Sequence, residues 1–361
     1  MYASDCTDWC AAKTGPRRDV IGELAKALRK EGIVFGASSH RAEHWWFFDQ
    51  GMLFDCDVRD TNYAGLYGPA SNQRVAENQS EPPDRAFLED WLLRCCEIVD
   101  KYRPQVVYFD WWICQPVFQP YLQRFAAYYY NRAAAWKKPV AINFKRWEGE
   151  SFPEKTGVFD VERGQLQDIR PDFWQTCNSV SQNSWGYITN HNYKSVDHIL
   201  DDLIDIVSKN GALLLNIGPK PDGAIAETEQ KMLLEIGRWL KINGEAIYGT
   251  RPWRIFGEGP TSVVGGPFAD MKRKAFTSQD FRFTTRGGTL YAIALAWPDD
   301  CKLIVKSLAR NENLAQGSIK DVRLLGYQGR LRWTQTAEGL VVSLPDKPPC
   351  DYAVALKIKE S

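Results

Sequence analysis

Two short runs decide what kind of fold this chain has. The first is VVYFDWW at residues 106–112, and the second is GVFDVERG at residues 157–164. Each is a β-branched or aromatic stretch with an acid at its carboxyl end, Asp110 in the first run and Glu162 in the second. Because a (β/α) barrel carries its functional residues at the carboxyl ends of its strands, both runs predict barrel strands.

Helical and strand-like segments alternate around these two runs, from residue 17 to about residue 250. Alternation of this kind predicts an α/β fold with a mostly parallel sheet. The expected helices cover residues 19–30, 86–102, 120–136, 196–209 and 227–243. The expected strands cover residues 33–39, 105–110, 140–144, 157–161, 180–188 and 212–217. A closed barrel needs eight strands, so the prediction is a TIM-like barrel that lacks its first two strands.

The sequence pattern changes after residue 253, where short runs of alternating apolar and polar residues are separated by glycines and prolines. This pattern predicts an antiparallel β-sandwich. The expected strands cover residues 289–296, 302–305, 322–325, 340–344 and 352–358. We therefore expect a barrel domain over residues 1–250 and a C-terminal β-sandwich domain over residues 251–361.

Composition narrows the partners and the compartment. Lysine and arginine together number 45 and equal the 45 acids, so the charge favours neither a nucleic-acid partner nor a membrane surface. The abundance of aromatic residues weakly supports a carbohydrate partner. The nine cysteines lack zinc spacing and are expected as reduced thiols, and no cofactor is expected. Without a signal peptide the expected location is cytoplasmic, or periplasmic or secreted if the true N-terminus lies upstream.

The two strand-end acids suggest a chemistry. A pair of carboxyl groups is the minimum for hydrolysing a glycosidic bond, with one acting as nucleophile and the other as general acid and base. Any single acid is more often a helix cap or a salt-bridge partner. Two acids at strand ends, each with tryptophan or arginine beside it, favour the catalytic interpretation.

The segment HRAEH at residues 40–44 spells H-x-x-E-H, which in some zinc peptidases places two histidines one helical turn apart. That interpretation needs a helix, whereas this segment follows a predicted strand directly and is expected as a strand-end loop. No metal site is predicted. The alternative is that His40, Glu43 and Trp45 line a sugar site, where imidazole and carboxylate bond hydroxyl groups.

Several ordered segments resemble family 29 α-L-fucosidases, from about residue 5 to residue 253, with a weaker resemblance to the family's C-terminal domain beyond. They are DW at 8–9, GPRRDVIGEL at 15–24, FG at 35–36, YFD at 108–110, Asn143 with RW at 146–147, SWGY at 184–187, NG at 210–211, LLNIGP at 214–219, DG at 222–223 and WLKINGEAIY at 239–248. The resemblance implies a retaining exo-glycosidase that hydrolyses terminal α-L-fucosyl residues of glycans through a covalent fucosyl-enzyme intermediate.

The resemblance also implies roles for residues. Asp110 matches the family's nucleophile position, and Arg146 matches an arginine near the sugar, with a salt bridge as its structural alternative. Trp111 and Trp112 are expected to wall the pocket against the methyl group of fucose, with core packing as the alternative for each.

The acid/base is less directly indicated. Some members carry a glutamate after the tryptophan that corresponds to Trp174, but this chain has Gln175, which cannot transfer a proton. The expected acid/base is therefore Glu162, and Asp160 and Asp168 are its competitors. Retention would place the carboxyl groups of Asp110 and Glu162 about 5–5.5 Å apart.

The chain departs from the family in one respect. Members carry two further barrel strands and a pair of adjacent histidines that hold the fucose, and this chain has no His-His pair. We expect a homo-oligomer in which another copy covers the open edge. The alternative function is a catalytically impaired or non-catalytic carbohydrate-binding relic. The sequence leaves the linkage and the leaving group open.

Overall fold

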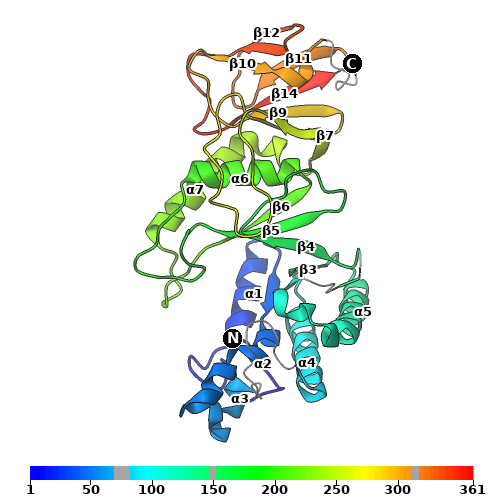
Figure 1. Cartoon of the computed structure of the whole chain (residues 1–361), viewed down its shortest axis with the longest axis vertical. Helices are drawn as coiled ribbons and strands as arrows, with labels where there is room; N and C mark the ends of the chain where they lie inside the picture. Colours follow the sequence, from blue (N-terminus) through cyan, green and yellow to red (C-terminus); the bar gives the residue numbers. More distant parts are fainter. Residues whose placement is uncertain (69–81, 146–151, 154, 311–316, 361) are drawn as a thin grey trace. The chain divides into compact units, whose positions relative to one another are not determined.

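The computed structural model describes residues 1–68, 82–145, 152–153, 155–310 and 317–360 (Figure 1). The chain divides into two units, Met1–Asp160 and Val161–Ser361. Among the described residues, no helix is long and apolar enough to cross a membrane. All nine cysteines are free thiols.

Parallel strands in chain order form the sheet of the first unit. They are β1 (Gly36–Ser39), β2 (Val106–Phe109), β3 (Ala141–Lys145) and the start of β4 (Val158–Glu162). Each strand pairs in parallel with the next. Helix α1 (Val20–Lys30) precedes β1, and α4 (Arg85–Tyr102) and α5 (Gln119–Trp136) form the two crossovers that follow. This is the predicted alternation, with element ends within about three residues of those expected.

Local chemistry explains where these helices begin and end. The side chain of Asp19 accepts a hydrogen bond from the Gly22 amide at the start of α1, and Asp84 caps α4 in the same way. Such caps satisfy amide groups that have no partner within the helix. At the other end of α4, Arg103 adopts a left-handed conformation before Pro104, which cannot continue a helix.

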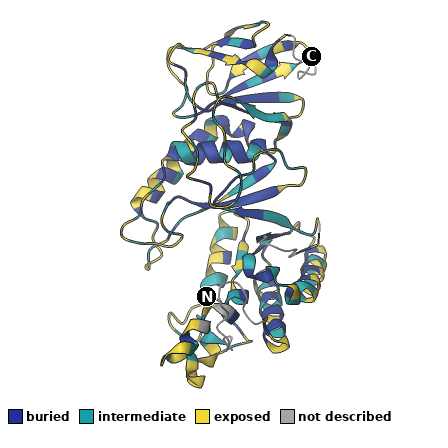
Figure 2. Ribbon diagram, viewed as in Figure 1, coloured by how far each residue is buried: buried dark blue, intermediate teal, exposed yellow. Residues whose placement is uncertain are grey.

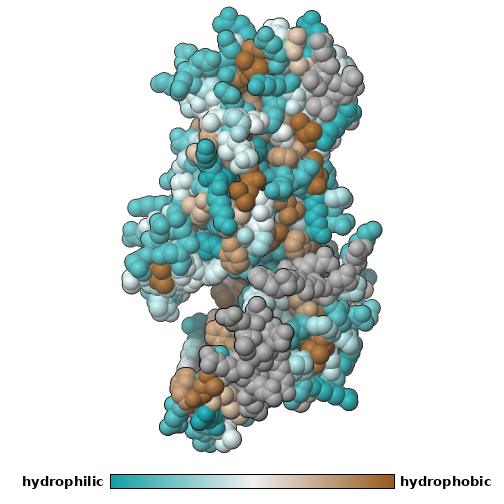
Figure 3. All heavy atoms as spheres, in the orientation of Figure 1, coloured by the Kyte–Doolittle hydropathy of each residue, from teal (hydrophilic) through white to brown (hydrophobic). Residues whose placement is uncertain are grey.

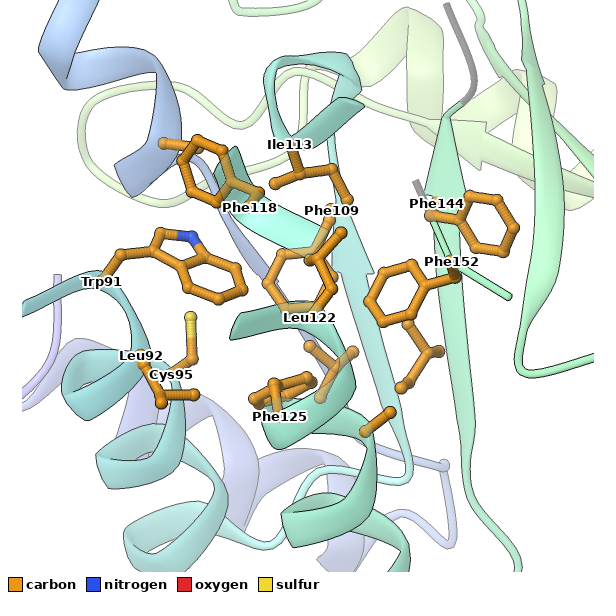
Figure 4. Close-up of a cluster of buried hydrophobic side chains, with 14 of the residues drawn as sticks. Trp91, Leu92, Cys95, Phe109, Ile113, Phe118, Leu122, Phe125, Phe144 and Phe152 are labelled. Carbon is orange, nitrogen blue, oxygen red and sulfur yellow. The ribbon is translucent and has the colours of Figure 1, made fainter. Parts of the chain in front are cut away.

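Aromatic side chains fill the space between the sheet and helices α4 and α5 (Figure 4). Phe109 of β2 is fully buried, and its ring centroid lies 5.5 Å from that of Trp91 and 5.1 Å from that of Phe125. Because side chains alternate along a strand, the burial of Phe109 on the helix side directs its neighbours Tyr108 and Asp110 to the other face.

The segment after β1 is helical rather than the expected loop. It consists of one-turn elements: η1 (Arg41–Glu43), α2 (His44–Phe47), η2 (Asp49–Leu53), η3 (Asp57–Arg59), η4 (Thr61–Tyr63) and α3 (Ala64–Tyr67). The expectation of a strand-end loop was wrong in this respect. Ala42 and Trp45 are buried and pack on the aromatic cluster, which stabilises the first two turns. The sequence pattern alone did not show that these two residues are buried, so the turns were not predicted.

The second unit begins with a parallel pair, β5 (Trp174–Ser179) and β6 (Gly211–Asn216), joined through α6 (Val196–Ser208) and followed by α7 (Glu227–Asn243) and η7 (Gly244–Ala246). The predicted strand at 180–188 was wrong, because the strand lies just before it. All six residues of β5 are buried. Its polar side chains are bonded internally, as when Thr176 Oγ1 donates to the carbonyl of Val161 at 2.6 Å. Because β5 contains several polar residues, it lacks the apolar run from which a buried strand is usually predicted.

Two antiparallel sheets complete the second unit. One has the strand order β11-β14-β9-β8-β7 and the other β10-β13-β12. The strands are β7 (Arg251–Glu258), β8 (Phe281–Arg286), β9 (Thr289–Ala294), β10 (Lys302–Val305), β11 (Ile319–Leu324), β12 (Arg332–Gln335), β13 (Leu340–Ser343) and β14 (Val354–Glu360), with the turn η8 (Lys306–Leu308) after β10. Buried side chains from both sheets form one core, and burial follows the central strands (Figure 2).

The described residues thus contain six parallel strands and two packed antiparallel sheets. The predicted fold, a partial (β/α) barrel followed by a β-sandwich, is confirmed. Strands β7, β8 and β12 were not predicted. The domain boundary near residue 250 stays a prediction.

Candidate functional site

Three side chains meet where neighbouring strands of the first unit end. The strand register aligns Ser39, Phe109 and Phe144 in one row across β1, β2 and β3. The residue that follows each of them therefore lies at the same level of the sheet. These three residues are His40, Asp110 and Lys145.

Asp110 is the centre of this group. Its Oδ1 lies 3.0 Å from Nζ of Lys145 and accepts a hydrogen bond of 2.8 Å from the Trp111 amide, while its Oδ2 lies 3.5 Å from Nδ1 of His40. The Lys145 side chain is 9% exposed and that of Asp110 is 17% exposed. A buried ammonium group thus holds the carboxylate of Asp110, which stays partly open to solvent.

Glu43 contributes a second carboxyl group to the same place. Both of its carboxyl oxygens are buried and have no hydrogen-bond partner among the residues that the structure describes. Burial raises the pKa of Glu43 to about 8, and the negative charge of Asp110 adds to this effect. Near neutral pH the group therefore holds a proton and can donate one hydrogen bond.

The same residues are the only candidate metal ligands grouped within the described chain. One ligand atom each from His40, Glu43 and Asp110 lie within 4.8 Å of one another. The ammonium of Lys145 at Asp110 opposes a bound cation. His44 is not in the group: its ring packs at 5.3 Å from that of Phe48, and burial lowers its pKa. Only the first histidine of H-x-x-E-H, His40, therefore belongs to this group.

The three tryptophans predicted to line the pocket pack against other aromatic side chains of the first unit. Trp45 is 6% exposed and lies edge-on to Phe87, and Trp112 is 9% exposed within the aromatic cluster. Trp111 is partly buried and lies perpendicular to Trp112 at 4.8 Å. Their role as sugar walls stays a prediction. Arg146 lies outside the described residues.

Sequence reasoning missed Lys145 as a site residue. A lysine that ends an otherwise buried strand was the available signal, since Ile142 to Lys145 are buried without interruption. The competitor Asp160 is also buried, and its Oδ1 accepts a hydrogen bond of 3.3 Å from the Tyr108 hydroxyl. The choice between Asp160 and Glu162 as the acid/base stays a prediction.

Glu162 is the last residue of β4 and belongs to the second unit, whereas Asp110 belongs to the first. The carbonyl of Glu162 accepts a hydrogen bond of 2.9 Å from the Phe268 amide. Its other competitor, Asp168, is exposed and accepts a bond from the amide of the next residue, Ile169. The expected separation of the carboxyl groups of Asp110 and Glu162 stays a prediction.

Fold and strand-end chemistry together define a class of protein. The parallel strands carry a fixed carboxylate at the carboxyl end of β2 and a further acid at the carboxyl end of β4, and two antiparallel sheets follow them. This is the architecture of a barrel glycoside hydrolase.

Comparison with known proteins gives the particular family. The model of the α-L-fucosidase family matches residues 1–245, and the model of the α-L-fucosidase C-terminal domain matches residues 274–359. The chain belongs to the α-L-fucosidase family.

Individual relatives agree with this assignment. Tissue α-L-fucosidase of Rattus norvegicus is 30% identical over 353 residues, which cover 96% of this chain and 66% of the rat protein. The Homo sapiens protein of the same name is 30% identical, covering 97% of this chain and 67% of the human protein. The structure of Thermotoga maritima α-fucosidase in complex with fucose matches with a TM-score of 0.71 at 25% identity, covering 99% of this chain and 71% of that one. The chain thus spans about two thirds of the length of its mammalian relatives.

Proposed function

We propose that this protein is a retaining exo-glycosidase that releases terminal α-L-fucosyl residues from glycans. Asp110 is the nucleophile, and Glu162 is the general acid and base. The observation that carries the proposal is the carboxylate of Asp110, held at 3.0 Å by Lys145 at a strand end in a chain of the α-L-fucosidase family.

The reaction proceeds in two displacements. A carboxylate oxygen of Asp110 attacks the anomeric carbon, and the bond from that carbon to the leaving-group oxygen breaks. Glu162 gives its proton to that oxygen, so the leaving group departs as an alcohol. Water then attacks the anomeric carbon and gives a proton to Glu162, while the ester bond to Asp110 breaks. Two inversions give net retention.

The neighbours of Asp110 have supporting roles in this proposal. Lys145 keeps the carboxylate in one orientation, because its buried side chain contacts Oδ1 of Asp110. His40 and protonated Glu43 provide hydrogen bonds for sugar hydroxyl groups. Trp111, Trp112, Trp45 and Arg146 are proposed to complete the sugar pocket.

Substitution of the nucleophile tests the proposal. In Asp110→Ala, kcat for an aryl α-L-fucoside should fall by at least about 10⁴-fold with an unchanged circular-dichroism spectrum, because no ester can form. Asp55→Asn, at an exposed aspartate of the same unit, should keep wild-type activity. Retained activity in Asp110→Ala would overturn the mechanism. Wild-type protein that binds fucose by calorimetry without turnover would favour the carbohydrate-binding relic.

The substrate partner is a fucosylated oligosaccharide or glycoconjugate. We propose that residues 1–250 provide the catalytic domain and residues 251–361 an accessory domain. The nine free thiols support a reducing compartment such as the cytoplasm.

A second copy of the chain is also proposed as a partner. Within the described residues, β1 pairs with β2 and has no strand on its other side. Just before β1, Ile33 and Val34 are 53% and 58% exposed. An open strand edge with apolar neighbours favours pairing with another chain. Analytical ultracentrifugation should show a dimer, and a stable monomer at all concentrations would contradict this.

A further inference from the structure

The carboxyl end of β4 is held in place by a segment from much later in the chain. The Phe268 amide donates to the carbonyl of Glu162, and the amides of Ala269 and Asp270 donate to the carbonyl of Arg163 at 2.9 and 3.0 Å. Residues 268–270 therefore lie directly against the proposed acid/base. Any side chain that this segment exposes therefore lies near the carboxyl end of β4.

Arg163, the residue after Glu162, links this segment to a second one. Its guanidinium lies 3.3 Å from a carboxylate oxygen of Asp270 and donates to the carbonyls of Ser181 and Gln182 at 2.8 and 3.0 Å. The side chain is buried, and its backbone is left-handed at φ 45°. Such strain persists where the surroundings fix a residue, and it is concentrated at functional sites.

The second segment presents an exposed tryptophan. The ring centroid of Trp185 lies 5.1 Å from Cζ of Arg163, and the carbonyl of Trp185 accepts a hydrogen bond of 2.7 Å from the Asn216 side chain. These contacts fix the indole at the carboxyl ends of β4 and β6. The residue nevertheless remains 36% exposed.

Phe268 provides a second exposed aromatic group beside Glu162. It is 50% exposed, and its backbone is left-handed at φ 53°. A bulky residue other than glycine rarely adopts this conformation. Apolar side chains reach the surface only in small separate patches on the face that Figure 3 shows. Phe268 is thus joined to Glu162 through the backbone, and Trp185 contacts Arg163, the next residue along the chain.

We infer that Trp185 and Phe268 form the binding surface for the leaving group, the sugar to which fucose is attached. This inference rests on the proposed function, because it takes Glu162 as the proton donor to the leaving-group oxygen. That oxygen must come within hydrogen-bond reach of Glu162, so the ring that carries it lies beside these residues. Aromatic faces provide large apolar contact area for the C–H faces of a pyranose.

The charges around this surface indicate a neutral leaving group. The charged group that contacts Trp185 is the guanidinium of Arg163, which is buried and paired with Asp270. Lys194, buried beside them, contacts the same carboxylate of Asp270. The ions are thus engaged within the protein, and the surface selects a neutral hexose or N-acetylhexosamine by stacking rather than by charge.

Three substrates separate this inference from its alternatives. A fucosylated disaccharide needs both a protonated leaving group and a site for the second ring. Methyl α-L-fucoside needs the proton but has no second ring. α-L-Fucosyl fluoride needs neither, because fluoride is a small and good leaving group. The values of kcat/KM for all three are to be measured in Trp185→Ala and Phe268→Ala.

For the disaccharide we expect kcat/KM to fall about 10-fold in Trp185→Ala and about 5-fold in Phe268→Ala, as loss of an aromatic contact implies. The values for the methyl fucoside and the fluoride should stay within about twofold of wild type. Trp185→Phe, which keeps a ring, should recover most of the disaccharide activity. Phe173→Ala removes a similarly exposed phenylalanine, 53% exposed, just before the opposite end of β5 and should change nothing.

Other outcomes would overturn the inference. An equal loss for the disaccharide and the methyl fucoside, with the fluoride unchanged, would show that the aromatic residues act by positioning Glu162. No loss for any substrate would show that they do not contact the leaving group. Wild-type protein that hydrolyses none of the three substrates would refute the proposed function itself, and the inference with it.

Discussion

Two buried acidic clusters, one in each unit, differ in how their carboxyl groups are paired. In the second unit, helix α6 buries Asp202 and Asp205, and the described structure gives each an arginine partner within 3.3 Å and bonds both of its carboxyl oxygens. In the first unit, Glu43 is buried beside Asp110 with no hydrogen-bond partner among the described residues. The acids of α6 are paired with cations, whereas the carboxyl oxygens of Glu43 can still accept or donate hydrogen bonds.

This difference separates structural charge from functional charge. A buried ion that is fully paired has no capacity left for a ligand, and its removal leaves its partners uncompensated. A buried carboxyl group without a partner costs stability, and such a cost persists where a ligand supplies the missing bonds. On this criterion the paired α6 acids are structural, and the Glu43 and Asp110 pair is the better candidate for a ligand site.

The largest expected effect comes from breaking the ion pairs of the α6 acids. Asp205 contacts both Lys209 and Arg282, and all three side chains are at most 3% exposed. Asp205→Ala should lower the free energy of unfolding by about 3–5 kcal/mol, because it leaves two buried cations without their anion. Urea denaturation measures this. Asp321→Asn, in an exposed pair with Arg323, is the control and should cost less than about 1 kcal/mol. Equal losses of stability in the two variants would contradict a structural role for the buried ion pairs of Asp205.

The next effect is a pH dependence caused by Glu43. Its pKa rises from 4.5 to about 8 on folding, so between these values the unfolded chain releases a proton that the folded chain keeps. The free energy of unfolding therefore falls as pH rises through this window, and below it the group contributes nothing.

Glu43→Gln cannot ionise and should remove this dependence. Relative to the variant, wild type should lose about 3 kcal/mol of stability between about pH 5 and pH 8. Urea denaturation at both pH values checks the difference. Glu31→Gln, at an exposed site of the same unit, should follow the wild-type profile. If the Glu43→Gln profile runs parallel to that of wild type, the carboxyl group is not the proton-holding site described here.

The smallest of the three effects concerns the support of Asp110. Lys145→Met should reduce kcat/KM for an aryl α-L-fucoside about 10- to 100-fold, because the carboxylate loses the ammonium that holds it at 3.0 Å. Lys138→Met, at an exposed lysine before β3, should leave the rate unchanged. If kcat/KM falls less than about threefold in Lys145→Met, Lys145 does not support catalysis, and its contact with Asp110 is only structural.

Local signals explain why the helices and most of the barrel strands could be predicted. Asp19 and Asp84 cap helices, Pro104 follows one, and the run that ends at Asp110 is apolar and β-branched. These features act within a few residues of the element that they define. The strand β5 was misplaced because its buried Thr176 and other polar residues do not show the usual apolar pattern.

The missed parts of the site depend on contacts between distant segments. Lys145 reaches Asp110 only through the register of β2 and β3, which no local pattern encodes. The amphipathic pattern of α6 predicted an apolar inward stripe and gave no indication that Asp202 and its neighbouring acids are buried too. Their burial depends on cations such as Arg273, more than 70 residues away along the chain.

The claim that Asp110 is the nucleophile can be tested directly by trapping the intermediate. Incubation with 2-deoxy-2-fluoro-α-L-fucosyl fluoride should form a slowly hydrolysed ester, because the fluorine at C2 disfavours the positively charged transition state of its breakdown. Peptide mass spectrometry should find one fluorofucosyl group on Asp110. A fluorofucosyl group on another carboxyl group, or none on a protein that hydrolyses fucosides, would contradict the account.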